Sequence, residues 1–226
     1  MSMTSRKPAR LRSGDAASLS EEYQLVDRIL GVPFTTSDGL SFMMGAIKTR
    51  HRGVCAEHAL IYKGPIEAPA APVLLRINSA CYTGDVFDCQ RCDCHWQLEE
   101  AKRRIHAEGG LIIYHFHHEG NAAGFTNKLK TYQVMDQEKK TMRDAYQHLH
   151  LEPDQRRYVS SILILEHFKI SRVKLITNNM RKRDILVQNG VAVSEVIPIV
   201  SQKAEHREYL ESKRDQYGHV IEFSHG

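Results

Sequence analysis

Four of the five cysteines of this 226-residue sequence lie in one polar stretch, CYTGDVFDCQRCDCHW, which covers residues 81–96. Disulfides persist mainly in exported proteins, and no apolar segment of the kind found in secretory signals follows the basic N-terminus. We therefore expect these thiols to bind a metal ion or to take part in catalysis rather than to pair.

Two arrangements of a metal site are open. Cys81, Cys89, Cys92 and Cys94 can form a closed zinc site, but its ligands would crowd one loop and no second C-x-x-C pair would clamp the metal. Three of the thiols with an open fourth position form a catalytic site, in which bound water becomes a nucleophile. Three thiolates leave zinc with a net charge of about −1, and Arg91, inside the cluster, would offset part of it. Unconnected buried thiols are the remaining alternative.

The elements that must position this stretch follow two patterns. Before it, residues 31–80 show short apolar segments separated by glycine and proline, which predicts strands and turns. After it, helical and strand-like segments succeed one another, which is typical of an α/β arrangement. The fold class we predict is α+β or mixed α/β, with a β-rich N-terminal lobe and an α/β C-terminal lobe. The expected helices are 95–110, 126–148, 154–168 with Asp154 as N-cap, and 180–189; the expected strands are 111–117, 172–179 and 191–200.

The ends of the chain have a different composition. Residues 1–20 are basic and contain little to bury, so we expect a disordered tail, with a transit peptide as the less favoured alternative, followed by a single catalytic domain over 21–226. Residues 18–30 resemble a short capped helix. In the expected helix 203–217, acidic residues interleave the basic ones, and no apolar run is long enough to span a bilayer. We expect a cytoplasmic protein whose partners include neither nucleic acid nor a membrane.

Several motifs, taken together, resemble one known family. The segments RINSACYTGDVFDCQRCDCHWQLEEA, EGGLIIYHFHHEG, NKLKTYQVMDQ, LITNNMRK and IPIVSQKAEHREYLESKRDQYGH are similar, in order from about residue 33 to 220, to GTP cyclohydrolase II. That family comprises the zinc enzymes that open the guanine ring at the start of riboflavin synthesis. The resemblance implies one Zn2+ per subunit held by Cys81, Cys92 and Cys94, with Cys89 as an extra thiol. It also implies Mg2+ bound with the triphosphate, and a homodimer.

The resemblance implies roles for further residues. The family removes C8 of the guanine ring as formate, releases pyrophosphate and leaves a diaminopyrimidine ribosylamine monophosphate. Tyr132 corresponds to the catalytic tyrosine, whose phenol can donate to a ring nitrogen. Asp154 and Arg156 correspond to an Asp-x-Arg pair, in which the arginine acts at the α-phosphate and the aspartate assists as a base. The structural alternatives are a tyrosine packed on the core, and an N-cap beside a solvated arginine.

Other positions correspond to substrate-binding residues of the family. These are Arg76 at the end of a strand, Thr177 in the expected strand 172–179, and Lys182 at the start of the expected helix that follows. The N-terminus of a helix can bind phosphate. Glu119 and Gly120 are retained from the family motif Arg-Gln-Glu-Gly-Arg, but both arginines are missing, and Asn121 stands at the second of them.

Two more differences lie just before the first thiol. Ala80 stands where the family usually has glutamate, and Asn78 where histidine is common. Because the metal, tyrosine and Asp-x-Arg positions are retained, these changes affect the identity of the substrate more than the type of reaction.

Three functions therefore remain open. The preferred one is the GTP ring-opening reaction. The second is a divergent paralog that acts on another nucleotide or a pyrimidine, or that stops at the formamide intermediate. The third is a non-catalytic, zinc-stabilised nucleotide-binding module, which would require Cys89 to close the metal site.

A run of histidines lies in the expected strand 111–117 and just beyond it. Strand alternation would put His115 and His117 on one face and His118 on the other. We therefore expect these side chains to line the pocket or to pack, rather than to bind a metal.

Overall fold

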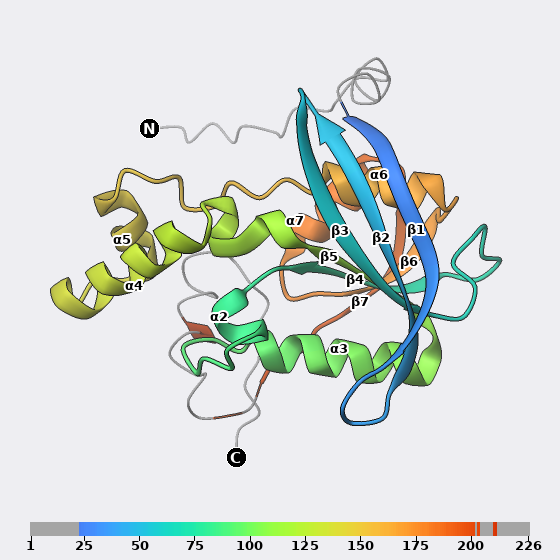
Figure 1. Cartoon of the computed structure of the whole chain (residues 1–226), viewed down its shortest axis with the longest axis horizontal. Coiled ribbons are helices and arrows are strands. Elements are labelled where there is room, and N and C mark those ends of the chain that lie inside the picture. The colour runs from blue at the N-terminus through green and yellow to red at the C-terminus, as the bar shows by residue number, and fades with distance from the viewer. Residues whose placement is uncertain (1–22, 202, 204–209, 212–226) are drawn as a thin grey trace, which may run out of the picture.

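A single mixed sheet organises the molecule. The computed structural model describes residues 23–201, 203, 210 and 211. Their strands form one seven-stranded sheet in the order β1-β2-β3-β5-β4-β6-β7 (Figure 1). The strands are β1 (Tyr23–Thr35), β2 (Ser41–His51), β3 (Val54–Lys63), β4 (Val73–Ser79), β5 (Gly110–His115), β6 (Arg172–Ile176) and β7 (Ala192–Ile197).

The sheet has an antiparallel half and a parallel half. β1, β2, β3 and β5 pair antiparallel, whereas β5, β4, β6 and β7 pair parallel. The predicted mixed α/β class is therefore confirmed, and the β-rich first part and the α/β second part share one sheet that is continuous through β5. Since β4 is parallel to both of its neighbours, the carboxyl ends of β4, β5 and β6 lie at one edge of the sheet.

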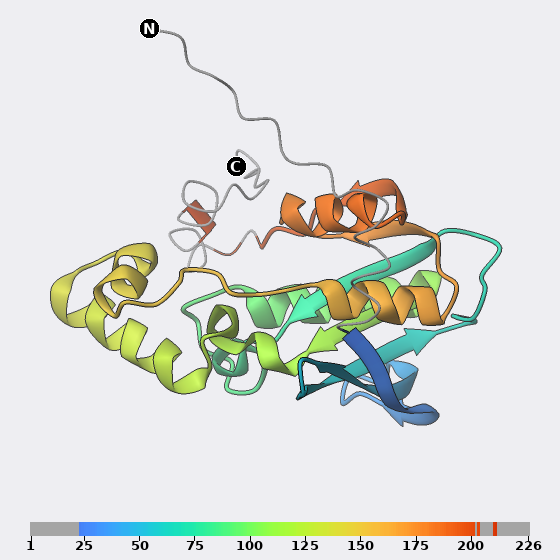
Figure 2. The same ribbon diagram turned by 90° about the horizontal axis from the view of Figure 1, so that it is seen from above.

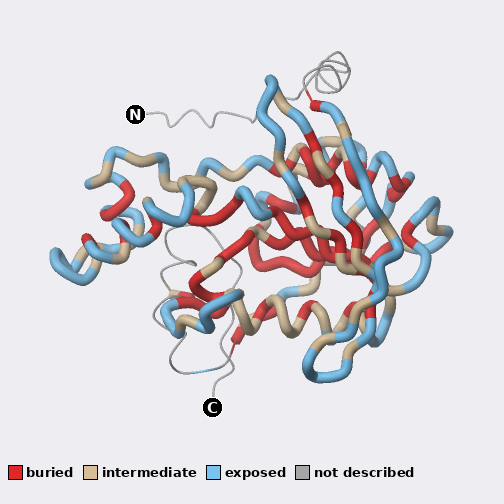
Figure 3. The backbone as a smooth tube through the Cα atoms, in the orientation of Figure 1, coloured by how far each residue is buried: buried red, intermediate tan, exposed pale blue. Residues whose placement is uncertain are grey.

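Helices cover both faces of the sheet. One core joins Ile105 of α3 to Ile112, and the other joins α6 and α7 to Leu111 and Ile113 on the opposite face. This alternation explains why the central strands are buried throughout (Figure 3). The α4–α5 hairpin projects beyond the end of the sheet (Figures 1 and 2). The helices are α2 (Tyr82–Asp85), α3 (Cys94–Glu108), the 3-10 helix η1 (Phe116–Ala122), α4 (Phe125–Glu138), α5 (Met142–His148), α6 (Val159–His167) and α7 (Met180–Gln188).

Two glycines, Gly109 and Gly110, join α3 to β5 for a steric reason. Gly109 caps α3 with a positive φ of 80°. A Cβ at Gly110 would lie only 2.3 Å from the carbonyl oxygen of Leu74 on the neighbouring strand. Glycine therefore lets β5 lie against β4 directly after the helix.

The predicted helix at 18–30 is wrong in the part that the structure describes. Residues from Tyr23 onward form β1, which pairs with β2 from Tyr23 opposite His51 to Thr35 opposite Ser41. Two bulges interrupt this pairing, so the apolar spacing does not alternate as in a regular strand. Pairing along β2 overrides the local cap signal, which was the only support for a helix.

Three further predictions need correction. The helix predicted over 154–168 begins only at Val159, so Asp154 is not its N-cap. The helix predicted over 126–148 is split into α4 and α5, because Lys139 adopts a left-handed conformation with φ 53°. The strand predicted over 111–117 ends at His115, where η1 begins.

Two predictions concern regions that are largely not described. The tail 1–20 lies outside the described residues, as does most of the predicted helix 203–217. Among the helices of the described ranges, none combines the length and the apolar character needed to cross a bilayer.

Candidate active site

Three thiols meet where β4 leads into α2 and where α3 begins. The Sγ atoms of Cys81 and Cys92 are 3.5 Å apart, and those of Cys81, Cys92 and Cys94 all lie within 4.8 Å of one another. A Cβ at Gly84 would lie 3.1 Å from the Cys92 sulfur and 3.3 Å from that of Cys81, so glycine leaves room for the sulfurs to converge. Tetrahedral zinc with bonds of about 2.3 Å separates its sulfur ligands by about 3.8 Å. The residues of this thiol cluster therefore fit zinc, and Cys89 is not among them.

Two carboxylates hold the loop that carries the first thiol. Asp85 accepts a hydrogen bond from the backbone N–H of Cys81 at 3.0 Å and another from the Tyr114 hydroxyl at 2.7 Å. Burial raises the pKa of Asp85 to about 6. Glu119 accepts from the backbone N–H of Tyr82. The backbone on both sides of the Cys81 side chain is thus fixed by buried acceptors from different elements.

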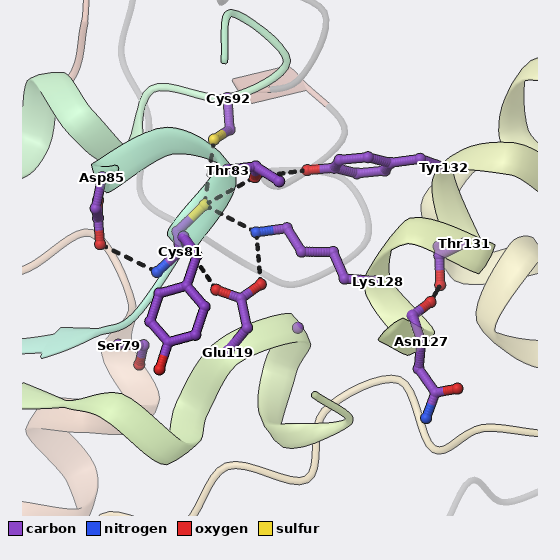
Figure 4. A network of polar contacts seen from close by, with 12 residues as sticks. Ser79, Cys81, Thr83, Asp85, Cys92, Glu119, Asn127, Lys128, Thr131 and Tyr132 are labelled. Atoms are coloured by element: carbon purple, nitrogen blue, oxygen red, sulfur yellow. Dashed lines mark hydrogen bonds and ion pairs between the residues drawn. The ribbon is translucent and has the colours of Figure 1, made fainter. Parts of the chain in front are cut away.

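Lys128 of α4 supplies the positive charge nearest to the thiols. Its Nζ lies 3.0 Å from the Cys81 sulfur and 2.8 Å from a carboxylate oxygen of Glu119 (Figure 4). Burial opposes the charged lysine, but the Cys81 sulfur and Glu119 outweigh it and raise the lysine pKa. Hydrogen bonds with the other two thiols, and then Lys128, lower the pKa of Cys81, whereas the bond to Cys81 raises that of Cys92 to about 12. One thiolate is stabilised in this way, and a bound cation would be needed to deprotonate all three.

Arg91 does not offset the charge of the thiols, as the sequence led us to expect. Its guanidinium donates two hydrogen bonds of 2.8 Å to the exposed carboxylate of Asp136. It also lies 5.0 Å from the centre of the Tyr132 ring. The cation beside the Cys81 sulfur is therefore Lys128 and not Arg91.

Tyr132 points toward the thiol cluster from α4. Its hydroxyl lies 3.4 Å from the Thr83 hydroxyl, which is itself 3.6 Å from the Cys81 sulfur. Burial raises the pKa of Tyr132, so the phenol keeps its proton at neutral pH. Figure 4 shows Tyr132, Thr83, Lys128 and Cys81 in one network. The Tyr132 hydroxyl therefore lies in the network beside the thiol cluster, and its ring is not part of the hydrophobic core.

A polar pocket opens beside the thiol cluster, at the carboxyl ends of β4 and β6. Cys94 belongs to the cluster through its sulfur and is also one of the residues that line the pocket, so the two adjoin. We call this the cationic pocket, because one lysine and two arginines contribute to its wall. It is lined by Arg76, Asn78, Ser79, Cys94, Gln97, Arg156, Thr177, Asn178, Asn179 and Lys182.

Arg76 is buried at the base of the cationic pocket. Its guanidinium donates to the side-chain oxygens of Gln97 at 2.8 Å and Asn78 at 3.2 Å, and to the Ile176 carbonyl at 3.5 Å. Burial lowers the pKa of Arg76. Because these acceptors are neutral, the guanidinium keeps a field that would attract an anion in the pocket.

The turn from β6 into α7 forms another wall of the pocket. Asn179 caps α7 through its side chain, which accepts from the backbone N–H of Arg181. The Thr177 hydroxyl accepts from the Asn179 backbone N–H at 3.0 Å. The Lys182 ammonium donates to the Ile77 carbonyl at 2.8 Å, which ties α7 to β4. Thr177 and Lys182, predicted from the sequence, thus lie in the same pocket as Arg76.

Asp154 and Arg156 form a tight ion pair in the segment before α6. The Arg156 side chain donates two hydrogen bonds of 2.8 Å to the carboxylate of Asp154, which also pairs with Arg181 at 2.8 Å. Burial would raise the pKa of Asp154, but Arg156 and Arg181 outweigh it and lower that pKa. The carboxylate therefore holds the guanidinium at the pocket and stays ionised.

Gly120 and Asn121 shape the link between β5 and α4 rather than the pocket wall. Both residues have positive φ, 58° and 55°, and a Cβ at Gly120 would lie 3.2 Å from the Lys128 Cβ. The Asn121 amide donates to the Pro153 carbonyl at 3.0 Å, and its own carbonyl accepts from the Gln155 N–H. Asn121 thus fixes the segment that carries Asp154 and Arg156, and it does not line the cationic pocket.

Sequence reasoning missed several residues of the site. Lys128 lies in the quoted motif NKLKTYQ, four residues before Tyr132, so both fall on one side of a helix. Gln97 lies three residues after Cys94 in α3, and residues with this spacing lie on the same side of a helix. Asn178 and Asn179 directly follow the predicted Thr177, and no pattern in the sequence indicated that they line a pocket.

Comparison with known proteins follows the same motifs. A family model described as GTP cyclohydrolase II matches residues 29–198. The riboflavin biosynthesis protein RibBA of Cytophaga hutchinsonii is 38% identical over 198 residues, which are 87% of this chain and 48% of that protein. GTP cyclohydrolase-2 of Acinetobacter baumannii is 37% identical over 167 residues, 74% of this chain and 83% of that protein. RibBA of Bacillus subtilis is 38% identical over 168 residues, 74% of this chain and 42% of that protein. The chain thus spans about half the length of the RibBA relatives and most of the Acinetobacter protein.

Proposed function

This chain belongs to the GTP cyclohydrolase II family, and from that premise we propose that it is a zinc-dependent hydrolase that opens the imidazole ring of GTP. The products are formate, pyrophosphate and a diaminopyrimidine ribosylamine monophosphate, for riboflavin synthesis. The observation that carries the proposal is the shared position of Cys94, which belongs to a three-thiol cluster and also lines a pocket with Arg76, Arg156 and Lys182. Metal chemistry and phosphate binding can therefore act on one molecule.

The thiol cluster is the proposed zinc site. Bound there by Cys81, Cys92 and Cys94, zinc would activate a water molecule for attack on the ring carbon. Lys128 offsets the excess negative charge of three thiolates, and Glu119 keeps the ammonium beside them. We propose that Cys89 is not a ligand, since its sulfur is not part of the cluster.

Tyr132 is the proposed proton donor during ring opening. Its phenol is protonated at neutral pH, lies in the Thr83–Cys81 network and can donate to a ring nitrogen on which charge develops. We infer that Arg91, stacked near the ring and anchored on Asp136, keeps the tyrosine in this orientation.

The cationic pocket is the proposed seat of the phosphates. Arg76 and Lys182 approach from β4 and α7, and Arg156, which Asp154 holds in place through two hydrogen bonds, adds its positive charge to the same pocket. We propose that Thr177 binds there through its hydroxyl, and that Mg2+ arrives bound with the triphosphate. Glu119 and Gly120 contribute indirectly, through Lys128 and through the turn that leads to α4.

Asp154 has a different proposed role from the one the resemblance implied. Its carboxylate bonds to two guanidiniums and has a lowered pKa, which makes it a weak base. We propose that Asp154 positions Arg156 at the α-phosphate and does not itself accept a proton from water.

A second function has one observation in its favour. The Asn121 amide donates its hydrogen bond to the Pro153 carbonyl, and the residue adds no positive charge to the pocket. A substrate with fewer phosphates, such as another nucleotide or a pyrimidine, is therefore the alternative. An enzyme that stops at the formamide intermediate belongs to the same alternative.

The test is the mass of the product. Zinc-replete full-length protein is incubated with GTP and Mg2+, and the products are identified by mass spectrometry beside assays for formate and pyrophosphate. Formate, pyrophosphate and the diaminopyrimidine support the proposal, and a retained formyl group supports the formamide variant. Turnover of another nucleotide with none of GTP would move the assignment to the divergent paralog. Absence of turnover together with zinc loss in Cys89→Ser would favour the non-catalytic binding module.

We also propose the wider setting that the family suggests. The catalytic domain covers residues 21–226, acts as a homodimer in the cytoplasm and has no nucleic-acid or membrane partner. Sedimentation at micromolar concentration tests the dimer.

A further inference from the structure

A second cluster of potential metal ligands lies on the opposite face of β5 from the Tyr114–Asp85 contact. His58 on β3 and His115 at the end of β5 are directly opposite in the antiparallel ladder. Their Nδ1 atoms are 2.8 Å apart, and a ring nitrogen of each, together with one of His117 in η1, lies within 4.8 Å of the others. Among the described residues, this histidine cluster and the thiol cluster are the two groups with such spacing.

Neighbouring hydroxyls orient the two buried rings. The Nε2 atom of His58 is 2.8 Å from the Thr49 hydroxyl, and that of His115 is 2.7 Å from the Ser161 hydroxyl. Without a metal, one Nδ1–H can donate to the other Nδ1 across the 2.8 Å contact. When each Nε2–H instead donates to its hydroxyl, both Nδ1 lone pairs point into the space between the rings. An outer hydrogen bond that fixes the tautomer is the usual arrangement around a metal-binding histidine.

One ring of the cluster is open to solvent. His58 and His115 are fully buried, whereas His117 is exposed, so an ion can reach the cluster from the His117 side.

His118 marks the border between this cluster and the cationic pocket. Its ring stacks on that of His115 with centroids 4.6 Å apart, but its two nitrogens are hydrogen-bonded to the Ser79 hydroxyl and the Arg157 carbonyl. It therefore separates the histidine cluster from Ser79 in the pocket wall, and it has no nitrogen left to join the cluster.

We propose that His58, His115 and His117 bind a second divalent transition-metal ion such as Zn2+, with water at the open fourth position. Three imidazoles suit zinc, cobalt, nickel or copper. Tetrahedral zinc with bonds of about 2.0 Å spaces its nitrogen ligands by about 3.3 Å. The two Nδ1 atoms therefore need to separate by only about 0.5 Å from their 2.8 Å spacing. This site does not depend on the proposed GTP chemistry.

No local pattern in the sequence predicts this site. Alternation along a strand extended to residue 117 separated His118 from His115 and His117, but β5 ends at His115 and η1 brings His117 back over it. His58 lies 57 residues away in the chain and joins the cluster only through the β3–β5 pairing.

The experiment distinguishes the two clusters by their ligand chemistry. Full-length protein is loaded with one equivalent of Zn2+, which the thiols retain, and is then titrated with Co2+ while the visible spectrum is recorded. We expect one further equivalent to bind and to give d–d bands of a nitrogen-ligated ion, without a thiolate-to-cobalt charge-transfer band. A thiolate band, or no binding up to millimolar Co2+, would overturn the proposal.

The variant that decides the site is His117→Ala. Because His117 is exposed, its removal leaves the buried pair and the fold in place, and circular dichroism checks this. We expect Co2+ affinity to fall about 100-fold. His148→Ala, at an exposed histidine of α5, is the matched control and should bind Co2+ like the unaltered protein. Equal affinity in all three proteins would exclude the histidine cluster as the site.

Discussion

The two ends of the candidate active site are built on different principles. At the thiol end, each charge has an opposite charge beside it: the Cys81 sulfur faces Lys128, and Lys128 faces Glu119. At the pocket end, Arg76 is buried against neutral amide and carbonyl oxygens. The thiol end is thus balanced for a cation bound by sulfur, whereas the pocket end carries positive charge that an anion would neutralise.

This difference shows how one site can bind two kinds of ligand, a metal cation at the thiols and an anion in the pocket. Burying a guanidinium on neutral acceptors is costly, and the cost falls when a phosphate takes part of the charge. Burying thiolates is equally costly until a metal binds them. Each end is therefore poised for its own ligand, and changes at one end should leave binding at the other intact.

The largest expected effect is at the thiol end. Cys81→Ser, Cys92→Ser or Cys94→Ser should each abolish zinc binding and formate release, while Cys89→Ser retains both. Metal analysis and a formate assay on the four proteins measure this. Nucleotide affinity should stay close to that of the unaltered protein in Cys81→Ser and Cys92→Ser if the two ends are independent, whereas Cys94 also lines the pocket. Loss of zinc in the Cys89 variant alone would refute the ligand assignment.

The largest effect at the pocket end should follow from Arg156→Ala. Removing the guanidinium should slow pyrophosphate release by about 1,000-fold, because it would stabilise charge on the transferred phosphoryl group. Zinc content should not change. Arg181→Ala is the matched control, since Arg181 is the other, exposed partner of Asp154. Equal losses in both variants would mean that Asp154, and not Arg156, carries the effect.

Tyr132 should connect the two ends. Tyr132→Phe keeps the ring and its contact with Arg91 but removes the proton donor, so formate release should fall by about 100-fold while GTP binding and zinc content persist. Single-turnover measurement of formate separates this step from binding. A normal rate of formate release would remove Tyr132 from the chemistry.

Lys128 tests the charge balance of the thiol end. Lys128→Gln removes the cation beside Cys81, so zinc affinity should weaken by about tenfold, as for other groups that support metal ligands. Arg91→Gln is the control, because Arg91 pairs with Asp136 at the surface. A chelator competition assay on both variants gives the affinities. A larger effect in Arg91→Gln would restore the role that the sequence first suggested for that arginine.

The sequence predicted the parts of the site whose residues lie close together in the chain. The thiols fall within one short stretch, and helices α3 and α7 lie close to the predicted ranges 95–110 and 180–189, so their placement could be derived from local sequence. The mixed fold followed from the succession of segments. What depends on pairing between distant strands could not be derived, as β1 and the histidine cluster show.

The same reason explains why Arg91 was predicted as the counter-charge of the thiols and Lys128 was not. Proximity in the chain favoured Arg91 as the counter-charge of the thiols, but the chain folds so that α4, from a later segment, faces the Cys81 sulfur. Asp154 was predicted as a helix cap from its position, and instead its carboxylate is taken up by Arg156 and Arg181, which a local pattern does not reveal.

The last expected effect, similar in size to that at Lys128, concerns Asn121, which lies outside the cationic pocket at a position where the resemblance to the family implies an arginine. Asn121→Arg adds charge, but it also removes the hydrogen bond to the Pro153 carbonyl at a position with φ 55°. Asn121→Ala loses the same hydrogen bond without adding charge, so the two variants should be compared with each other.

If GTP is the substrate, Asn121→Arg should bind it about tenfold more tightly than Asn121→Ala, which corresponds to about 1.4 kcal/mol. A charge-assisted contact to phosphate is worth about that much or more in a shielded site. Calorimetry at one salt concentration measures both affinities, and the zinc content of the two proteins should be equal because the thiol end is untouched. Equal GTP affinities would mean that no phosphate reaches this position, and the assignment would then move to a substrate with less phosphate.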